Sequence, residues 1–125
     1  PGEEHKGKMA SVAHQAWKKG KFKLFPKEPV RDFVYIDDVV DATLYAVFND
    51  VEKGVYEVGT SENRTFEDML NLMNIKYEYR DAIDIPKGYQ FLTKADKDKF
   101  MKGWKPKYSL EEGIKKYKSY LDGNL

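Results

Sequence analysis

The chain has 125 residues, with 22 Lys and Arg against 21 Asp and Glu, a formal net charge of +1, and no cysteine. This length allows one domain with a modest core, and the lack of cysteine excludes disulfides and thiolate metal sites. The balanced charge gives no reason to expect nucleic acid or an anionic membrane as a partner, and no apolar run approaches the roughly 20 residues needed to cross a bilayer.

The start of the sequence indicates a piece of a longer chain. It opens Pro1-Gly2-Glu3-Glu4 without an initiator methionine, and a turn-like Pro-Gly followed by charges is an unusual beginning for a native protein. We therefore expect residues 1–125 to form a single carboxy-terminal portion.

The first part of the chain predicts a helix, a short strand and a loop. Residues 8–19 repeat apolar side chains at helical spacing, His14 falls on the polar side, and Gly20 supplies a stop signal. Residues 22–25 alternate apolar and charged side chains, as a short strand does. Two prolines mark residues 26–30 as a loop.

A second strand and a second helix are predicted next. Residues 33–36 are the strand candidate, and Asp37 then caps a helix that runs to about Asn49. Asp37 and Asp38 could be read as a metal pair, but an apolar helix follows at once, so capping is preferred and no metal site is expected. The side chains predicted to face inward are Val40, Leu44, Val47 and Phe48.

The following segment predicts two short strands around a capped helix. Residues 55–58 form the first strand and residues 76–79 a weaker one. Residues 65–68 resemble a capping box, whereas no turn signal separates Asn74 from Ile75. The apolar side of the helix is predicted to carry Phe66, Met69, Leu70 and Met73.

Two further helices complete the chain. Residues 93–101 look helical and end before Gly103, and residues 109–112 form a clear capping box. The last helix is predicted to bury Leu110, Ile114, Tyr117 and Leu121. Helices that alternate with short strands predict an α/β fold, here a small mixed α/β subdomain.

The densest polar cluster is His5-Lys6-Gly7-Lys8, which directly precedes the first predicted helix. A helix amino terminus and two lysines suit an anion, and a lysine with a lowered pKa could transfer protons. A solvated basic loop would give the same local sequence, so both interpretations stay open.

Arg31 and Tyr89 are the other candidates. Arg31 follows a proline-rich loop, and a guanidinium binds phosphate through paired hydrogen bonds. Tyr89 lies in a predicted loop, where it could stack on a sugar or base or bond a hydroxyl. A surface ion pair of Arg31, for example with Asp32, and a structural role for Tyr89 remain the alternatives.

Several motifs together resemble a known superfamily. Residues 31–39, 54–60 and 103–113 are similar to the carboxy-terminal part of extended short-chain dehydrogenase/reductase enzymes that act on nucleotide sugars. Residues 1–12 and 89–96 further resemble the ADP-L-glycero-D-manno-heptose 6-epimerase family. No Gly-x-Gly-x-x-Gly fingerprint is present, so the dinucleotide-binding half of such an enzyme is not expected within this sequence.

The resemblance implies an NADP-dependent enzyme that oxidises and then reduces the sixth carbon of ADP-glycero-manno-heptose, inverting that centre for the lipopolysaccharide core. It implies a missing amino-terminal Rossmann domain, to whose sheet residues 54–74 would add. We expect an intact enzyme to be a cytoplasmic homo-oligomer and the chain alone to be inactive. The alternatives are another nucleotide-sugar epimerase or dehydratase, or a binding module without catalysis.

The same resemblance assigns roles to individual residues. Lys6 matches the second acid/base, which also lies at the cofactor, and Arg31 matches a substrate-contacting arginine, plausibly at the diphosphate. Substrate contacts are also implied for Phe25, Pro26, Lys27, Glu28 and Tyr89. They are implied too for Lys8, which stands where family members can carry Ser, and for Gln15, which stands where some carry a substrate-binding His.

Overall fold

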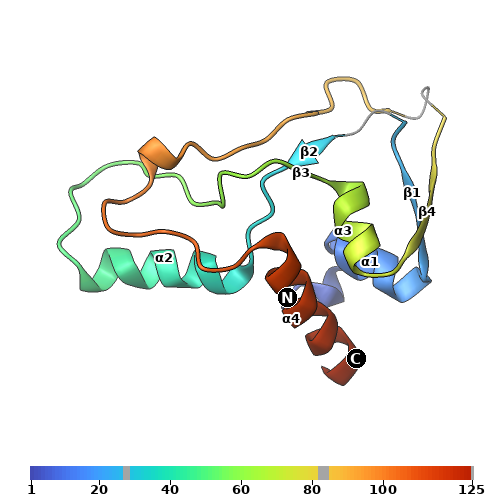
Figure 1. The fold of residues 1–125 in the computed structure, drawn as a ribbon, viewed down its shortest axis with the longest axis horizontal. Helices are drawn as coiled ribbons and strands as arrows, with labels where there is room; N and C mark the ends of the chain where they lie inside the picture. Colours follow the sequence, from blue (N-terminus) through green and yellow to red (C-terminus); the bar gives the residue numbers. More distant parts are fainter. Residues whose placement is uncertain (27–28, 82–84, 125) are drawn as a thin grey trace.

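The computed structural model describes residues 1–26, 29–81 and 85–124. It confirms an α/β fold with short strands, arranged as two groups of elements with long connections running between them (Figure 1). The elements in chain order are η1 (Glu4–Met9), α1 (Val12–Lys19), β1 (Lys21–Leu24), β2 (Val30–Arg31), α2 (Ile36–Phe48), β3 (Arg64–Thr65), α3 (Phe66–Leu72), β4 (Lys76–Tyr79), η3 (Lys97–Lys99) and α4 (Leu110–Asn124).

Helix α1 begins later than the sequence predicted. Ser11 caps it, because the Ser11 hydroxyl accepts a hydrogen bond from the His14 backbone N–H at 3.2 Å. The residues before it form the 3-10 segment η1, which is broken at Gly7 (φ 57°), and Met9 is exposed instead of facing the core. Gly20 ends α1 in the left-handed region (φ 67°), as predicted.

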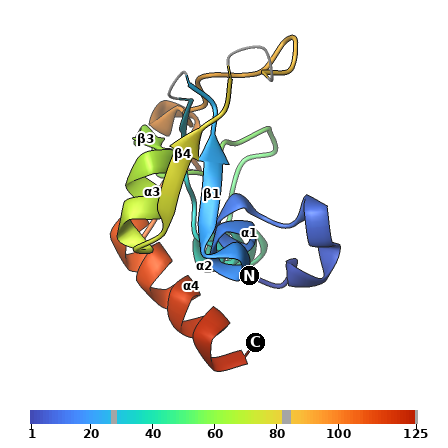
Figure 2. The same cartoon turned by 90° about the vertical axis from the view of Figure 1, so that its right-hand side faces the viewer.

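The strands form two small sheets. β1 and β4 pair in parallel, whereas β2 and β3 pair antiparallel. Figure 2 shows β1 and β4 side by side, running in the same direction. The predicted strand over residues 33–36 is wrong, because pairing stops at Arg31 and Ile36 already begins α2.

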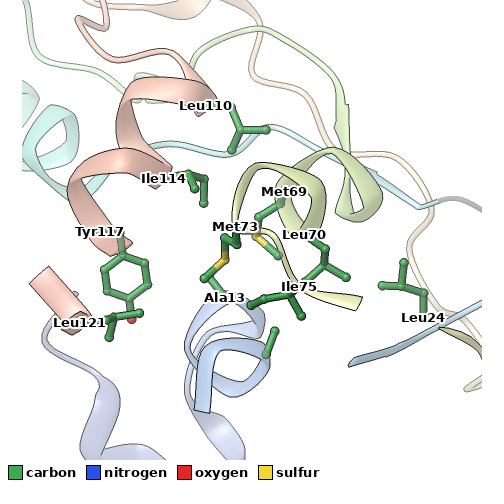
Figure 3. Packing of buried hydrophobic residues seen from close by; sticks show 11 residues of the cluster. Ala13, Leu24, Met69, Leu70, Met73, Ile75, Leu110, Ile114, Tyr117 and Leu121 are labelled. Atoms are coloured by element: carbon green, nitrogen blue, oxygen red, sulfur yellow. The ribbon is translucent and has the colours of Figure 1, made fainter. Parts of the chain in front are cut away.

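The main core lies between α1, α3 and α4. Figure 3 shows Met69 and Met73 between α4 and α1, whereas Leu70 lies on the side of β1. Leu70 and Leu121 are fully buried, so each contributes about 1.5–3 kcal/mol of hydrophobic stabilisation. The apolar faces predicted for α3 and α4 are therefore confirmed. The buried members of this cluster are Ala13, Ala16, Leu24, Met69, Leu70, Met73, Ile75, Leu110, Ile114, Tyr117 and Leu121.

Both predicted capping boxes are confirmed. Thr65 and Asp68 exchange side-chain and backbone hydrogen bonds of 3.0 Å at the start of α3, and Ser109 and Glu112 do the same at α4. The turn that the sequence did not signal after α3 is made by Asn74, whose φ of 57° lies in the left-handed region that asparagine tolerates.

Helix α2 differs most from the prediction. Its N-cap is Tyr35, which makes no side-chain capping bond, so Asp37 lies in the first turn and is not the cap. Buried Asp38 accepts hydrogen bonds from two later backbone N–H groups, and Ala42 packs against Met101 and Trp104. The side chains predicted to face inward are exposed instead: Val40 50%, Leu44 49%, Val47 69% and Phe48 79%.

Two more predicted elements are wrong. Residues 55–58 do not form a strand, and Val55 is 98% exposed, because a strand needs a neighbouring strand to complete its ladder. Of the helix predicted over residues 93–101 only η3 forms. The Ala95 and Asp96 N–H groups donate to carboxylates of distant residues, which competes with helical hydrogen bonding.

Within the described residues, no helix is both long and apolar enough to cross a membrane.

Candidate functional site

The structure brings Arg31 and Tyr89 together. The guanidinium carbon of Arg31 lies 5.4 Å from the centre of the Tyr89 ring and 5.8 Å from that of Phe66. One guanidinium nitrogen donates to the Val30 carbonyl at 2.9 Å, and another donates to the Gln90 carbonyl. Because a guanidinium carries five N–H donors, these bonds orient Arg31 and leave donors for an anionic ligand.

Aromatic side chains build the wall beside Arg31. The edge of Phe25 meets Tyr89 with ring centres 4.6 Å apart, and Tyr89 meets Phe91 at 5.2 Å. Pro26 is exposed next to Phe25, while Lys27 and Glu28, predicted to contact substrate, lie outside the described residues. A hollow of about 180 Å³ opens here, and it is lined by Val12, Phe22, Lys23, Leu24, Phe25, Pro29, Phe66, Arg80 and Tyr89.

Asp32, the residue after Arg31, joins distant segments of backbone. Its carboxylate accepts hydrogen bonds from the backbone N–H groups of Thr60 and Ser61, each at 2.8 Å, and from that of Ala95 at 3.0 Å. It also accepts one from the Thr60 hydroxyl at 2.5 Å. Asp32 is therefore a clamp joining three distant segments. The alternative that Arg31 pairs with Asp32 is not supported, because none of the ion pairs between described residues joins them.

Gly59 belongs to the same clamp. A Cβ placed on this residue would lie 2.7 Å from both the Ala95 Cβ and the Asp32 carboxylate, closer than real Cβ contacts come. Only glycine therefore lets the 59–61 turn approach Asp32. The sequence showed Gly59 as part of a polar loop, and nothing local signalled that Asp32 binds across the chain.

Lys6 and Lys8 lie apart from Arg31. The Lys6 ammonium is 2.6 Å from the Glu3 carboxylate, and this hydrogen bond and charge lower the pKa of Glu3. Both lysines are exposed on η1. Figure 1 and Figure 2 both place η1 low in the molecule and the loop that carries Tyr89 at the top. The structure therefore does not bring these lysines into contact with the Arg31 cluster.

Gln15 braces the segment that carries both lysines. Its amide nitrogen donates to the Ala10 carbonyl at 2.7 Å and to the Lys8 carbonyl at 3.3 Å. These bonds fix the end of η1 against α1. The amide oxygen of Gln15 is the atom left to accept a hydrogen bond from a ligand hydroxyl.

A larger hollow of about 590 Å³ lies beside η1, with mostly apolar walls from α1, α3, α4 and the start of α2. Gly2 and Glu3 border it, and it shares Val12 and Phe66 with the smaller hollow. The two hollows thus share a wall, with Gly2 and Glu3 bordering the larger one and Phe25 and Tyr89 bordering the smaller one.

His14 corrects another prediction. It is buried rather than on a polar surface, stacks on Trp17 with ring centres 6.1 Å apart, and its Nδ1 has no hydrogen-bond partner within the described residues. Across the same described residues, no three His, Asp or Glu side chains gather as a metal site would require.

Comparison with known proteins supports a specific relationship. The sequence model of the NAD dependent epimerase/dehydratase family matches residues 1–59. The chain is 34% identical to an ADP-L-glycero-D-manno-heptose-6-epimerase of Fusobacterium nucleatum, over 97% of the chain and 45% of that protein. It is 32% identical to the Brachyspira hyodysenteriae protein of the same name, over 98% of the chain and 43% of that protein. The chain thus spans less than half the length of these relatives.

Solved structures agree with the sequence comparison. The crystal structure of the Helicobacter pylori ADP-L-glycero-D-manno-heptose-6-epimerase superposes with a TM-score of 0.75 at 29% identity, over 98% of the chain and 41% of that protein. UDP-glucuronic acid 4-epimerase of Bacillus cereus gives 0.73 at 21% identity, over 90% of the chain and 40% of that protein, which shows a shared fold alone. The resemblance that the sequence motifs indicated is confirmed.

Proposed function

Since the chain is similar in sequence and fold to the carboxy-terminal part of ADP-L-glycero-D-manno-heptose 6-epimerases, within the NAD-dependent epimerase/dehydratase family, we propose that it is the substrate-binding part of such an enzyme. The intact protein would invert the sixth carbon of ADP-glycero-manno-heptose for lipopolysaccharide core synthesis. The observation that carries this proposal is the Arg31 guanidinium, which two backbone carbonyls hold against the Tyr89 ring.

Arg31 binds the diphosphate in this proposal. Its guanidinium is partly buried and already oriented, so little side-chain entropy is lost when an anion binds. Tyr89 and Phe25 offer an aromatic wall on which a flat part of the substrate can lie, and the Tyr89 hydroxyl can bond a substrate hydroxyl. Pro26, Lys27 and Glu28 are proposed as further substrate contacts.

Lys6 is the proposed catalytic acid/base. When bound, NADP would supply the chemistry of hydride acceptance and return. Lys6 fits a place beside it, because its ammonium is exposed and the neighbouring hollow of about 590 Å³ is open and apolar. Its role is to hold or move a proton at the substrate hydroxyl, while Lys8 and Gln15 contact the substrate from the same segment.

The remaining half of the enzyme would cover what this chain leaves open. The exposed apolar face of α2 and residues 55–58, which form no strand here, suit contact with a nucleotide-binding domain, to whose sheet residues 54–74 would add. Relatives more than twice as long as the aligned chain support such a domain. We further propose that the intact enzyme is a cytoplasmic homo-oligomer and that the chain alone has no epimerase activity.

Calorimetry of the chain with ADP-glycero-manno-heptose tests the proposal. We expect binding, and a loss of about 2–5 kcal/mol for Arg31→Ala, because a desolvated diphosphate loses its charged partner. Lys6→Ala is the matched control: it removes the same charge, should keep affinity within about tenfold, and should abolish turnover only in the complete enzyme. Equal affinity of the Arg31→Ala variant would leave Arg31 a surface residue.

A second candidate is a module that binds nucleotide sugars without catalysis. The same Arg31 and Tyr89 geometry would serve it. It differs from the first because the complete protein would bind the nucleotide sugar without epimerase turnover. Binding by the complete, unaltered protein with no turnover would favour this candidate, whereas full turnover after Lys6→Ala would mean that another group is the acid/base.

A further inference from the structure

We propose that Arg80, which lines the hollow next to the Arg31 and Tyr89 pair, is a second cation of the site and binds the phosphate groups of the nucleotide. The inference rests on the proposed function, since it extends the same hollow. Arg80 directly follows β4, in a stretch where the sequence indicated nothing beyond the end of a weak strand.

The sheet fixes the position of Arg80. Its backbone N–H donates to the Leu24 carbonyl at 2.6 Å, which continues the parallel ladder beyond Tyr79. Parallel strands end at the same edge of a sheet, as Figure 2 shows for β1 and β4. Arg80 therefore stands beside Phe25, the residue that follows β1.

The side chain of Arg80 reaches the aromatic wall. Its guanidinium carbon lies 5.7 Å from the centre of the Phe25 ring, within the range of a cation–π contact. Phe25 contacts Tyr89, and Tyr89 contacts the guanidinium of Arg31. One aromatic pair thus carries a guanidinium on each side, and Arg80 itself lines the hollow.

The charges around Arg80 favour an anion. The described residues lining the hollow include Lys23 and Arg80 but no Asp or Glu. None of the ion pairs between described residues involves Arg80. The guanidinium is exposed, so a ligand phosphate can approach it from solvent and receive two parallel hydrogen bonds.

This arrangement suits a nucleoside diphosphate, which combines a planar base with neighbouring negative charges. An aromatic pair can hold the base or the sugar, and guanidinium groups on both sides can neutralise the phosphates. Arg80 then contributes affinity for the charged part of the ligand rather than for its base.

The test is calorimetry of the 125-residue chain with ADP and with adenosine. Arg80→Ala is expected to weaken ADP binding roughly tenfold to hundredfold, the value of a charge-assisted hydrogen bond, and to change adenosine binding less than about threefold. Arg80→Lys should keep part of the ADP affinity as a point charge. Lys76→Ala, which removes an exposed charge at the opposite end of β4, is the control and should change neither ADP binding nor adenosine binding.

Each outcome decides something. Equal losses for ADP and adenosine would overturn the phosphate contact, and unchanged ADP binding by Arg80→Ala would overturn any role of Arg80. If Arg31→Ala weakens ADP binding as expected while Arg80→Ala does not, Arg80 alone is refuted. If the chain binds other nucleotides more tightly than ADP-heptose, and this binding is still weakened by Arg80→Ala, the proposed substrate is wrong but the phosphate contact of Arg80 is supported. Absence of ADP binding by the unaltered chain would refute both.

Discussion

The two groups of elements in this molecule bury their helices very differently. Leu70 on α3 and Leu121 on α4 are fully buried, whereas Val47 and Phe48 on α2 are 69% and 79% exposed (Figure 1). All three helices carry apolar side chains at helical spacing. The difference shows that an amphipathic pattern predicts a face that needs a partner, while the partner itself must come from elsewhere in the fold.

The functional residues follow the same division. The group that contains α1, α3, α4, β1 and β4 is called the closed group here, because its helices bury their apolar faces. Arg31, Tyr89 and Arg80 are held by contacts with this group. Within the described residues, the Lys6 ammonium has one ion pair, with Glu3 three residues away. Contacts within the chain thus hold the proposed binding residues in place, whereas the proposed catalytic lysine is held by one local ion pair.

The largest expected effect breaks the closed group. Leu70→Ala should lower the free energy of unfolding by about 2–5 kcal/mol, because it leaves a cavity among α1, α3 and α4 (Figure 3). Val47→Ala on α2 should change it by less than about 0.5 kcal/mol, because the side chain is already in water. Urea denaturation of both variants measures the contrast. A comparable loss for Val47→Ala would mean that the α2 face is covered in solution.

A smaller effect concerns the joint between the two groups. Buried Asp38 accepts hydrogen bonds from the backbone N–H groups of Lys107 at 2.9 Å and Tyr108 at 3.0 Å, and so ties α2 to the segment before α4. Asp38→Ala leaves these groups unsatisfied and should cost about 2–3 kcal/mol. Asp38→Asn, which keeps one acceptor, should cost less.

Tryptophan fluorescence sharpens this prediction, since each group contains one tryptophan. Trp104 packs against α2, and Trp17, which lies on α1, donates its indole N–H to Asp122 of α4 at 2.8 Å. In a Trp17→Phe background, Trp104 is the remaining tryptophan. After Asp38→Ala, the change in its fluorescence should occur at a lower urea concentration than the loss of the helical circular dichroism signal. Coincident transitions would show that the two groups unfold as one unit.

Sequence reasoning succeeded where the signal was local. Gly20, the Thr65 and Asp68 capping box, and the equivalent box at α4 each act over three or four residues, so their structural meaning can be read directly. The resemblance also identified Arg31 and Tyr89, which the structure places in contact.

Sequence reasoning failed where the contact that decides the structure joins residues far apart in the sequence. Asp32 bonds Ala95, 63 residues away, and Arg80 meets Phe25 only because β1 and β4 pair in parallel. Residues 55–58 carry the pattern of a strand but have no neighbouring strand among the described residues, so the pattern alone could not produce the element.

The smallest expected effect concerns the tie between η1 and α4. The Tyr117 hydroxyl donates to the Glu4 carboxylate at 2.8 Å, and burial raises the pKa of Tyr117 to about 12. A raised pKa means that its contribution to stability is complete below about pH 10 and is lost as pH rises toward 12. Tyr117→Phe should therefore cost about 1 kcal/mol at pH 7 and flatten the alkaline loss of stability. Urea unfolding at pH 7, 9 and 11 measures both effects, with Tyr79→Phe, a half-exposed tyrosine on β4, as the control. If Tyr117→Phe leaves the loss of unfolding free energy between pH 9 and 11 unchanged, the bond between Tyr117 and Glu4 does not hold η1 against α4. The hydrogen bonds of Gln15 to the Lys8 and Ala10 carbonyls would then be what holds the end of η1 in place.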